Sequence, residues 1–414
     1  MRSAVGLRSR IRSCLTALLA LLSLTGLAQA GEPAHTCELR GRPWLEGRIR
    51  GRTQLASVVD AKLGEEVEIF VVIPGTLDGR PVQFSEDGSR GRVSWSGSGC
   101  PKLRVAFQRV EPRMQHTTTK APNGELKVYA NSVIFGPSHG KWLGYDQLEY
   151  FETPLPASPA DPGAARLLVR DARPTTPAAA RPVGHEGLGT MRLAATVALG
   201  ATILQTPGLG DVSAGLISDR VFRYSFRQGD GFLGWLTAFY NVPYLFGSAG
   251  EGARNQTERL LGADCADILV GALRRAGRRD LHYTNVGGVI DALGRSAGPT
   301  LVAACPSQAP GQDVSAILAS CQSRSDPPLR FGKDVQPGDI LAVDYVGAGD
   351  LPRAWDHIVV LVEDRGPNGT PDGILGPHDI VADSGDAQAL KFTTLNEQGT
   401  VRVLAARPRS VPIF

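Results

Sequence analysis

The chain has 414 residues, with 44 basic and 41 acidic side chains and a formal net charge of +3. This length is enough for two domains of ordinary size, and the near balance of charge excludes the basic character of a nucleic-acid-binding protein. After residue 30, no segment reaches the ~20 apolar residues of a membrane-spanning helix, so we expect a protein that does not span a membrane.

Residues 1–30 have the three parts of a secretory signal peptide. Four arginines come first, an apolar stretch covers 15–24, and Ala28-Gln29-Ala30 has the small residues of a cleavage site. Without these four arginines the net charge of +3 becomes −1. We therefore expect export to the periplasm or the extracellular space, where disulfides persist.

Residues 31–153 contain short β-like segments separated by turn residues, which predicts a small β-rich domain, a sandwich or a barrel. No group of catalytic residues occurs in it, so its role is not indicated. The expected strands cover 66–73, ending at Pro74-Gly75, and 93–95, 103–107 and 127–130.

Residues 154–184 are rich in proline and alanine and are expected to form a linker. A second domain is then expected over 185–414. Because a helix with a cysteine precedes strands with a histidine, the pattern favours an α+β fold. The expected elements are a strand at 193–204, helices at 264–276 and 286–293, and strands at 339–343, 357–362, 380–382 and 401–404.

Counting the six cysteines leaves one without a disulfide partner. One lies in the signal peptide, and two neighbouring pairs are natural disulfides, each within one region. An unpaired cysteine in an exported protein is a linker between chains or a reactive thiol, and its surroundings favour the reactive thiol. The six are Cys14 in the signal, the pairs Cys37–Cys100 and Cys305–Cys321, and the unpaired Cys265.

Cys265 directly precedes the apolar-periodic run of the expected helix, so it falls in the first turn, where the helix macrodipole favours a thiolate. Asp267 would disfavour that thiolate if it faced inward. His357 opens an apolar strand, and a thiolate with an imidazole base is the machinery of a cysteine hydrolase. Taken alone, His357 has an alternative interpretation as a structural histidine bonded to a neighbour.

Three motifs in this order resemble the NlpC-type cell-wall cysteine peptidases, a compact branch of the papain-like fold. They lie within 240–386, and this sequence departs from the family pattern at Ser248, at Ala266-Asp267 and in about ten extra residues over 250–260. The motifs are Pro243-Tyr244-Leu245-Phe246-Gly247-Ser248, Gly262-Ala263-Asp264-Cys265-Ala266-Asp267, and Gln336-Pro337-Gly338-Asp339-Ile340 followed by His357.

The resemblance implies a papain-like domain in which the cysteine helix packs on an antiparallel sheet. It makes Cys265 the nucleophile and His357 the general base, with Tyr244 and Asp264 supporting the site and its oxyanion region. The third polar residue is expected near the end of the following strand, where the family position falls on an alanine. We choose Asp383, which strand alternation turns away unless a bulge intervenes; Asp379 and Ser384 are the alternatives.

Residues 368–379 align with a twelve-residue calcium loop, although hydrolysis itself requires no cofactor. The alternative is a Gly/Pro-rich hairpin turn with solvated aspartates. The candidate ligands are Asn368, Thr370, Asp372, Ile374 through its carbonyl, and Asp379.

The leading hypothesis is therefore an exported cysteine endopeptidase or amidase that acts on peptidoglycan stem peptides or a similar cell-envelope amide. One alternative is a non-catalytic envelope-binding protein that keeps the fold. The other is a transglutaminase-like acyl transferase, which shares the chain order of the catalytic groups but not the Pro-Gly-Asp-Ile segment before the histidine strand.

Overall fold

The computed structural model describes residues 35–112, 150–155, 165–175, 181–213, 216–245, 248–249, 255–301, 328–345, 355, 357–385, 389–395 and 401–414. The expected signal peptide over 1–30, the expected strand at 127–130, and Cys305 and Cys321 lie outside these residues. The fold is α+β, mostly sheet with a few short helices. None of the helices described here is long and apolar enough to cross a membrane.

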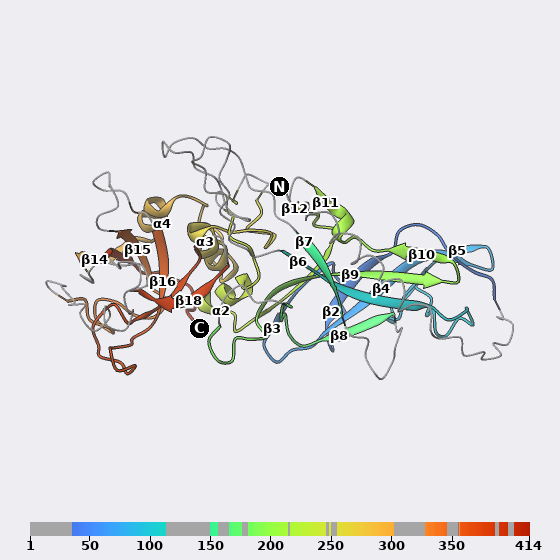
Figure 1. Ribbon diagram of the computed structural model, residues 1–414, viewed down its shortest axis with the longest axis horizontal. Helices are drawn as coiled ribbons and strands as arrows, with labels where there is room; N and C mark the ends of the chain where they lie inside the picture. Colours follow the sequence, from blue (N-terminus) through green and yellow to red (C-terminus); the bar gives the residue numbers. More distant parts are fainter. Residues whose placement is uncertain are drawn as a thin grey trace, which may run out of the picture.

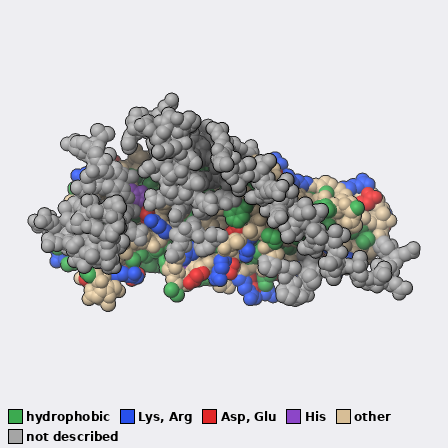
Figure 2. Space-filling model, viewed as in Figure 1, with side chains coloured by type: hydrophobic (Ala, Val, Ile, Leu, Met, Phe, Trp, Pro, Cys, Tyr) green, Lys and Arg blue, Asp and Glu red, His purple; other side chains and the backbone are tan. Residues whose placement is uncertain are grey.

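Figure 1 shows an elongated molecule, with two sheets of the N-terminal half at one end and a third sheet with the main helices at the other. On the described part of the face drawn in Figure 2, basic and acidic side chains lie close together. This mixed surface agrees with the nearly balanced composition.

The first sheet is built around β4 (Val67–Leu77), which is buried along most of its length. The strand continues through Pro74, where the sequence predicts its end. Proline lacks an N–H, but its carbonyl accepts a hydrogen bond from the Arg40 N–H (2.8 Å), so it fits in the strand. The strands paired with β4 are β1 (Cys37–Leu39), β2 (Trp44–Ile49), β5 (Arg80–Phe84) and β8 (Arg166–Val169).

The second sheet joins segments from both sides of residue 185. Its order is β3 (Val58–Lys62), β13 (Phe222–Arg227), β9 (Gly189–Leu199), β6 (Arg104–Pro112) and β7 (Tyr150–Pro154), with β10 (Thr202–Gln205) pairing β9. β13 pairs with β3 in parallel, and β9 pairs with β6 along seven residues.

This pairing differs from the expected domain boundary, because β9, β10 and β13 belong to a sheet of the N-terminal half. A boundary lies where few contacts cross, and here two strands cross it. The expected linker over 154–184 contributes strand β8 to the first sheet and Pro154, the last residue of β7, to the second sheet. Along the chain, η1 (Leu209–Asp211), β11 (Val212–Ser213) and β12 (Leu216–Ile217) lie between β10 and β13, whereas α2 (Phe232–Leu236) and η2 (Thr237–Phe239) follow β13.

The third sheet and two helices form the C-terminal end of the molecule. Helix α3 (Cys265–Arg275) contacts β16 and α2, and α4 (Val286–Leu293) contacts β15 and β19. Both helices lie where the sequence predicts them. The antiparallel strand order is β14 (Arg295–Leu301), β19 (Val401–Ala406), β15 (Ile340–Tyr345), β16 (His357–Glu363), β17 (Ile380–Asp383) and β18 (Lys391–Thr394).

One hydrophobic core connects the two ends of the molecule. It contains Val71 of β4 and Phe226 of β13, Leu269 of α3, and Val360 of β16, all almost fully buried. A second cluster, including Val359, covers the opposite face of the third sheet. The helix that begins at Cys265 is therefore packed between the N-terminal sheets and the C-terminal sheet.

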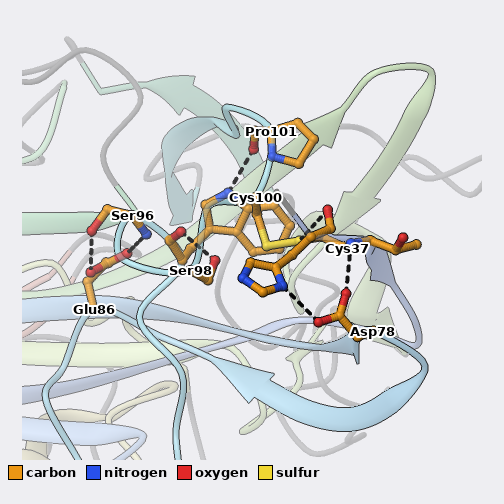
Figure 3. The surroundings of a disulfide bond; sticks show 10 residues. Cys37, Asp78, Glu86, Ser96, Ser98, Cys100 and Pro101 are labelled. Atoms are coloured by element: carbon orange, nitrogen blue, oxygen red, sulfur yellow. Dashed lines mark hydrogen bonds and ion pairs between the residues drawn. A yellow bond between two sulfur atoms is a disulfide. The ribbon is translucent and has the colours of Figure 1, made fainter. Parts of the chain in front are cut away.

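A disulfide joins Cys37 and Cys100 (Figure 3), with an S–S distance of 2.01 Å and a sequence separation of 63. Nearby, the Trp95 indole N–H donates to the Pro101 carbonyl (2.9 Å). A cross-link over this separation stabilises the folded state by ~4 kcal/mol on the chain-entropy model. It fixes β1 to the loop that precedes β6.

Candidate active site

Asp264 caps helix α3 and places Cys265 in its first turn. Its carboxylate Oδ1 accepts hydrogen bonds from the N–H groups of Ala266 (3.0 Å) and Asp267 (2.9 Å). Cys265 carries a free, half-buried thiol, and its own N–H is not used by this cap. The positive end of the helix dipole therefore lies at the sulfur, where it favours negative charge.

His357, the first residue of β16, lies against both Cys265 and Asp383. Its Nε2 is 2.5 Å from Asp383 Oδ1, and the two side chains are 12% and 4% exposed. The imidazole also forms a hydrogen bond with Cys265. Because Asp383 occupies Nε2, Nδ1 is the nitrogen that remains for the sulfur.

The surroundings of His357 favour its protonated form. Burial lowers the pKa of this imidazole, but its hydrogen bonds with Asp383 and Cys265, and the charges of those groups, raise the pKa to about 10. At neutral pH the structure thus holds a cation beside the Cys265 sulfur, an arrangement that stabilises a thiolate.

The pairing of β16 with β17 explains how Asp383 reaches the histidine. Val360 lies opposite Ala382, so Asp383 follows one step further along β17, next to the start of β16 where His357 lies. The register shifts between Leu361 and Glu363, an irregularity in this strand pair. This shift lies beyond the Leu361–Val381 pair, on the side away from Asp383. Asp383 Oδ1 contacts His357 Nε2, whereas Ala382 belongs to the core cluster that also contains Leu269 of α3.

Lys391 is a site residue that the sequence does not indicate. Its Nζ lies 3.8 Å from Asp383 Oδ2, because β18 pairs Lys391 with Asp383. The ammonium group favours the ionised form of the carboxylate. A strand at 391–394 was not expected from the sequence, and with it this neighbour was missed.

Tyr244 lies beside the same group. Its backbone forms a bridge with Ala263, just before the helix cap. Burial, followed by the negative charges of Cys265, Asp264 and Asp383, raises the pKa of the Tyr244 hydroxyl well above 10. The phenol therefore keeps its proton and can donate a hydrogen bond.

Asp267 and Ser248, two departures from the family pattern, contact each other. The Asp267 carboxylate accepts from Ser248 Oγ (2.7 Å) and from the Ala249 N–H (2.9 Å). Burial and the nearby charge of Asp264 raise the pKa of Asp267 to about 7. This carboxylate thus holds Ser248 and Ala249 against the start of α3.

The loop over 364–379 is held by aspartates that accept hydrogen bonds from backbone N–H groups. Buried Asp379 accepts from Arg365 (2.7 Å) and Gly376 (2.6 Å), and Asp364 accepts from Asp372 (3.1 Å). Burial, together with the charges of Asp364 and Asp372, raises the pKa of Asp379 to about 7. The Asp379 carboxylate is thus bonded to the backbone of its own loop, and not to His357. Ser384, the other alternative for the third residue, follows Asp383 in the chain and is buried.

Among the described residues, no group of three or more His, Cys, Asp or Glu side chains is arranged to hold a metal ion. Calcium binding by Asn368, Thr370, Asp372, Ile374 and Asp379 stays a prediction.

No family model matches this chain, and neither curated proteins nor solved structures give a significant match. The site is therefore defined by its own geometry. A free thiol, an imidazole and a carboxylate are in contact in series, with a protonated phenol alongside. Such a set can form and break a thioester.

Proposed function

We propose that this protein is an exported cysteine hydrolase that cleaves an amide bond, on a papain-like arrangement of helix and sheet. Cys265 is the nucleophile, His357 the general acid and base, and Asp383 the group that orients the imidazole. The observation that carries the proposal is the hydrogen-bonded series Cys265–His357–Asp383 at the start of a capped helix.

In the first half of the reaction, the Cys265 thiolate attacks the amide carbonyl carbon. The oxyanion that forms accepts hydrogen bonds from the unused Cys265 N–H and from the Tyr244 hydroxyl. The carbon–nitrogen bond breaks, and His357 Nδ1 gives its proton to the leaving amine. The product of this half-reaction is a thioester on Cys265 and a neutral imidazole.

In the second half, His357 takes a proton from water, whose oxygen attacks the thioester. The carbon–sulfur bond breaks, releasing the carboxylic acid and restoring the thiolate beside the imidazolium. Asp383 stabilises the imidazolium in both halves and holds the ring with Nδ1 toward the sulfur.

The substrate class in this proposal is peptidoglycan stem peptides or a similar cell-envelope amide. The resemblance of the three motifs supports it, as does the disulfide, which fits an oxidising compartment outside the cytoplasm. An alanine occupies the family's position for the third polar residue, which would fit a scaffold without activity. In the proposed hydrolase, Asp383 takes that role instead, because it contacts His357.

The test is product analysis by mass spectrometry after incubation with purified peptidoglycan in oxygen-18-labelled water. We expect new amine ends and new carboxylates that carry one labelled oxygen for each bond cut. The variants Cys265→Ser and His357→Ala should lose at least about a thousandfold in rate. His282→Ala, at an exposed histidine outside the site, should keep the wild-type rate.

Each of the other outcomes would contradict hydrolysis in a different way. Products joined to an added amine, without the label, would indicate acyl transfer. Peptidoglycan that binds but yields no new ends would indicate a non-catalytic envelope-binding protein.

A further inference from the structure

A pocket lies at the opposite end of α3 from Cys265. Its volume is about 380 Å³. At a rise of 1.5 Å per residue, nine residues of helix place Arg274 roughly 14 Å from Cys265 along the axis. The pocket is therefore separate from the candidate active site. The residues that line it are Trp235, Glu258, Arg274, Arg275 and Arg279.

Arg275 has one donor without a partner. Its Nη2 donates to the Glu258 carbonyl (2.8 Å), and its Nη1 lies 3.5 Å from Asp60 Oδ2. Its Nε, by contrast, is buried and has no hydrogen-bond partner among the described residues. A buried donor left unsatisfied is unfavourable, and an acceptor atom in the pocket would remove that cost.

Arg279 and Trp235 complete the lining. Arg279 is exposed, and no described residue forms a hydrogen bond or ion pair with its guanidinium group. The guanidinium groups of Arg227 and Arg275 lie 3.9 Å and 5.4 Å from the centroid of the Trp235 ring. The wall of the pocket is thus a fixed aromatic face with positive charge beside it.

The charges of the lining do not cancel. Glu258 is the one carboxylate in it, and its Oε1 is bonded by Arg274 Nε (2.6 Å) and by the Tyr283 hydroxyl (3.0 Å). Basic residues in the last turn of a helix also interact well with its dipole, which accounts for Arg274 and Arg275. It does not account for Arg279, beyond the helix end, or for the unpartnered Nε.

We propose that this pocket binds a small ligand through an oxyanion, either a carboxylate or a phosphate. Guanidinium groups bind both anions with paired N–H donors, and the free donors are those of Arg279 and Arg275 Nε. The volume suits one small molecule or one end of a larger one. The Trp235 face would pack against the part of the ligand that carries the anion.

The experiment is isothermal titration calorimetry of the full chain with sodium phosphate and, separately, with sodium acetate, at ionic strength held constant with sodium chloride. We expect saturable binding of at least one anion below about 50 mM. Arg279→Ala should weaken it by at least about fivefold, and Arg275→Lys, which removes the Nε donor, should weaken it as well.

Arg104→Ala, at an exposed arginine on β6, is the matched control and should leave binding unchanged. Saturable binding of phosphate alone would indicate a phosphate group on the ligand, and saturable binding of acetate alone would indicate a carboxylate. Absence of saturable heat with both, or equal binding by Arg279→Ala and wild type, would overturn the proposal. Because Arg279 is exposed, its variant decides the question even if Arg275→Lys does not fold. Cys265→Ser should bind like wild type, so the result is independent of the proposed hydrolase activity.

Discussion

At the scale of single residues, the central feature is a histidine shared between a sulfur and a carboxylate. Its pKa, raised to about 10 from 6.5, means that the folded state binds the His357 proton more tightly than the unfolded state. The resulting stabilisation is fully present below pH 6.5 and is lost as the pH rises through about 10. In the proposed hydrolase, the protonated imidazole is therefore both the general acid and a source of stability.

Replacing Asp383 by asparagine should lower the pKa of His357, because the acceptor on Nε2 loses its negative charge. We expect hydrolysis to fall by about 10²- to 10⁴-fold. The stabilisation should also end at a lower pH than in wild type. An NMR titration of the His357 ring in both proteins measures the shift directly. An unchanged titration curve would contradict the role of Asp383; Asp291→Asn, at an exposed aspartate on α4, is the control.

At the scale of elements, the start of α3 holds two buried carboxylates close together. The Asp264 carboxylate accepts hydrogen bonds from N–H groups of the helix, whereas the pKa of Asp267 is raised to about 7. The folded state therefore disfavours ionised Asp267. Its destabilising effect grows as the pH rises from 3.8 to about 7 and is absent at lower pH.

Asp267→Asn should remove this effect while keeping an oxygen that can accept from Ala249 N–H. Relative to wild type, the variant should gain at least about 1 kcal/mol in free energy of unfolding between pH 5 and pH 8. Urea unfolding at the two pH values measures this difference. A gain that does not change with pH would show that Asp267 ionises normally in the folded protein.

Elements with strong local signals could be predicted from the sequence. Asp264 caps α3 and Asn285 caps α4, each before an apolar run, so both helices lie where expected. Strand β18 was missed because a four-residue strand that begins at a lysine has no clear alternation. The contact of Asp383 with His357 depends on how β17 pairs with β16, which no local pattern shows.

At the scale of the whole molecule, the N-terminal sheets hold the segment that leads to Cys265. Arg192 of β9 is buried, and its Nη2 donates to the carbonyls of Arg259 (3.2 Å) and Leu260 (2.8 Å). Asp60 of β3 contacts Arg275 of α3. The sequence did not reveal this connection, because the parallel pairing of β3 with β13 joins segments more than 150 residues apart.

The shared core predicts that the two ends of the molecule unfold together. The double variant Cys37→Ser/Cys100→Ser should lose about 2–5 kcal/mol of stability. Thermal unfolding followed by far-ultraviolet and near-ultraviolet circular dichroism should show one transition, lowered equally by both signals. Two transitions, with only the first one lowered, would show that the C-terminal end is an independent unit.

The most direct test of the central claim is the rate at which iodoacetamide alkylates Cys265 at pH 7, followed by mass spectrometry. Because the His357 imidazolium stabilises the thiolate, wild type should react at least about tenfold faster than His357→Gln. Equal rates in the two proteins, or a Cys265 that is already bridged to another cysteine, would contradict the account.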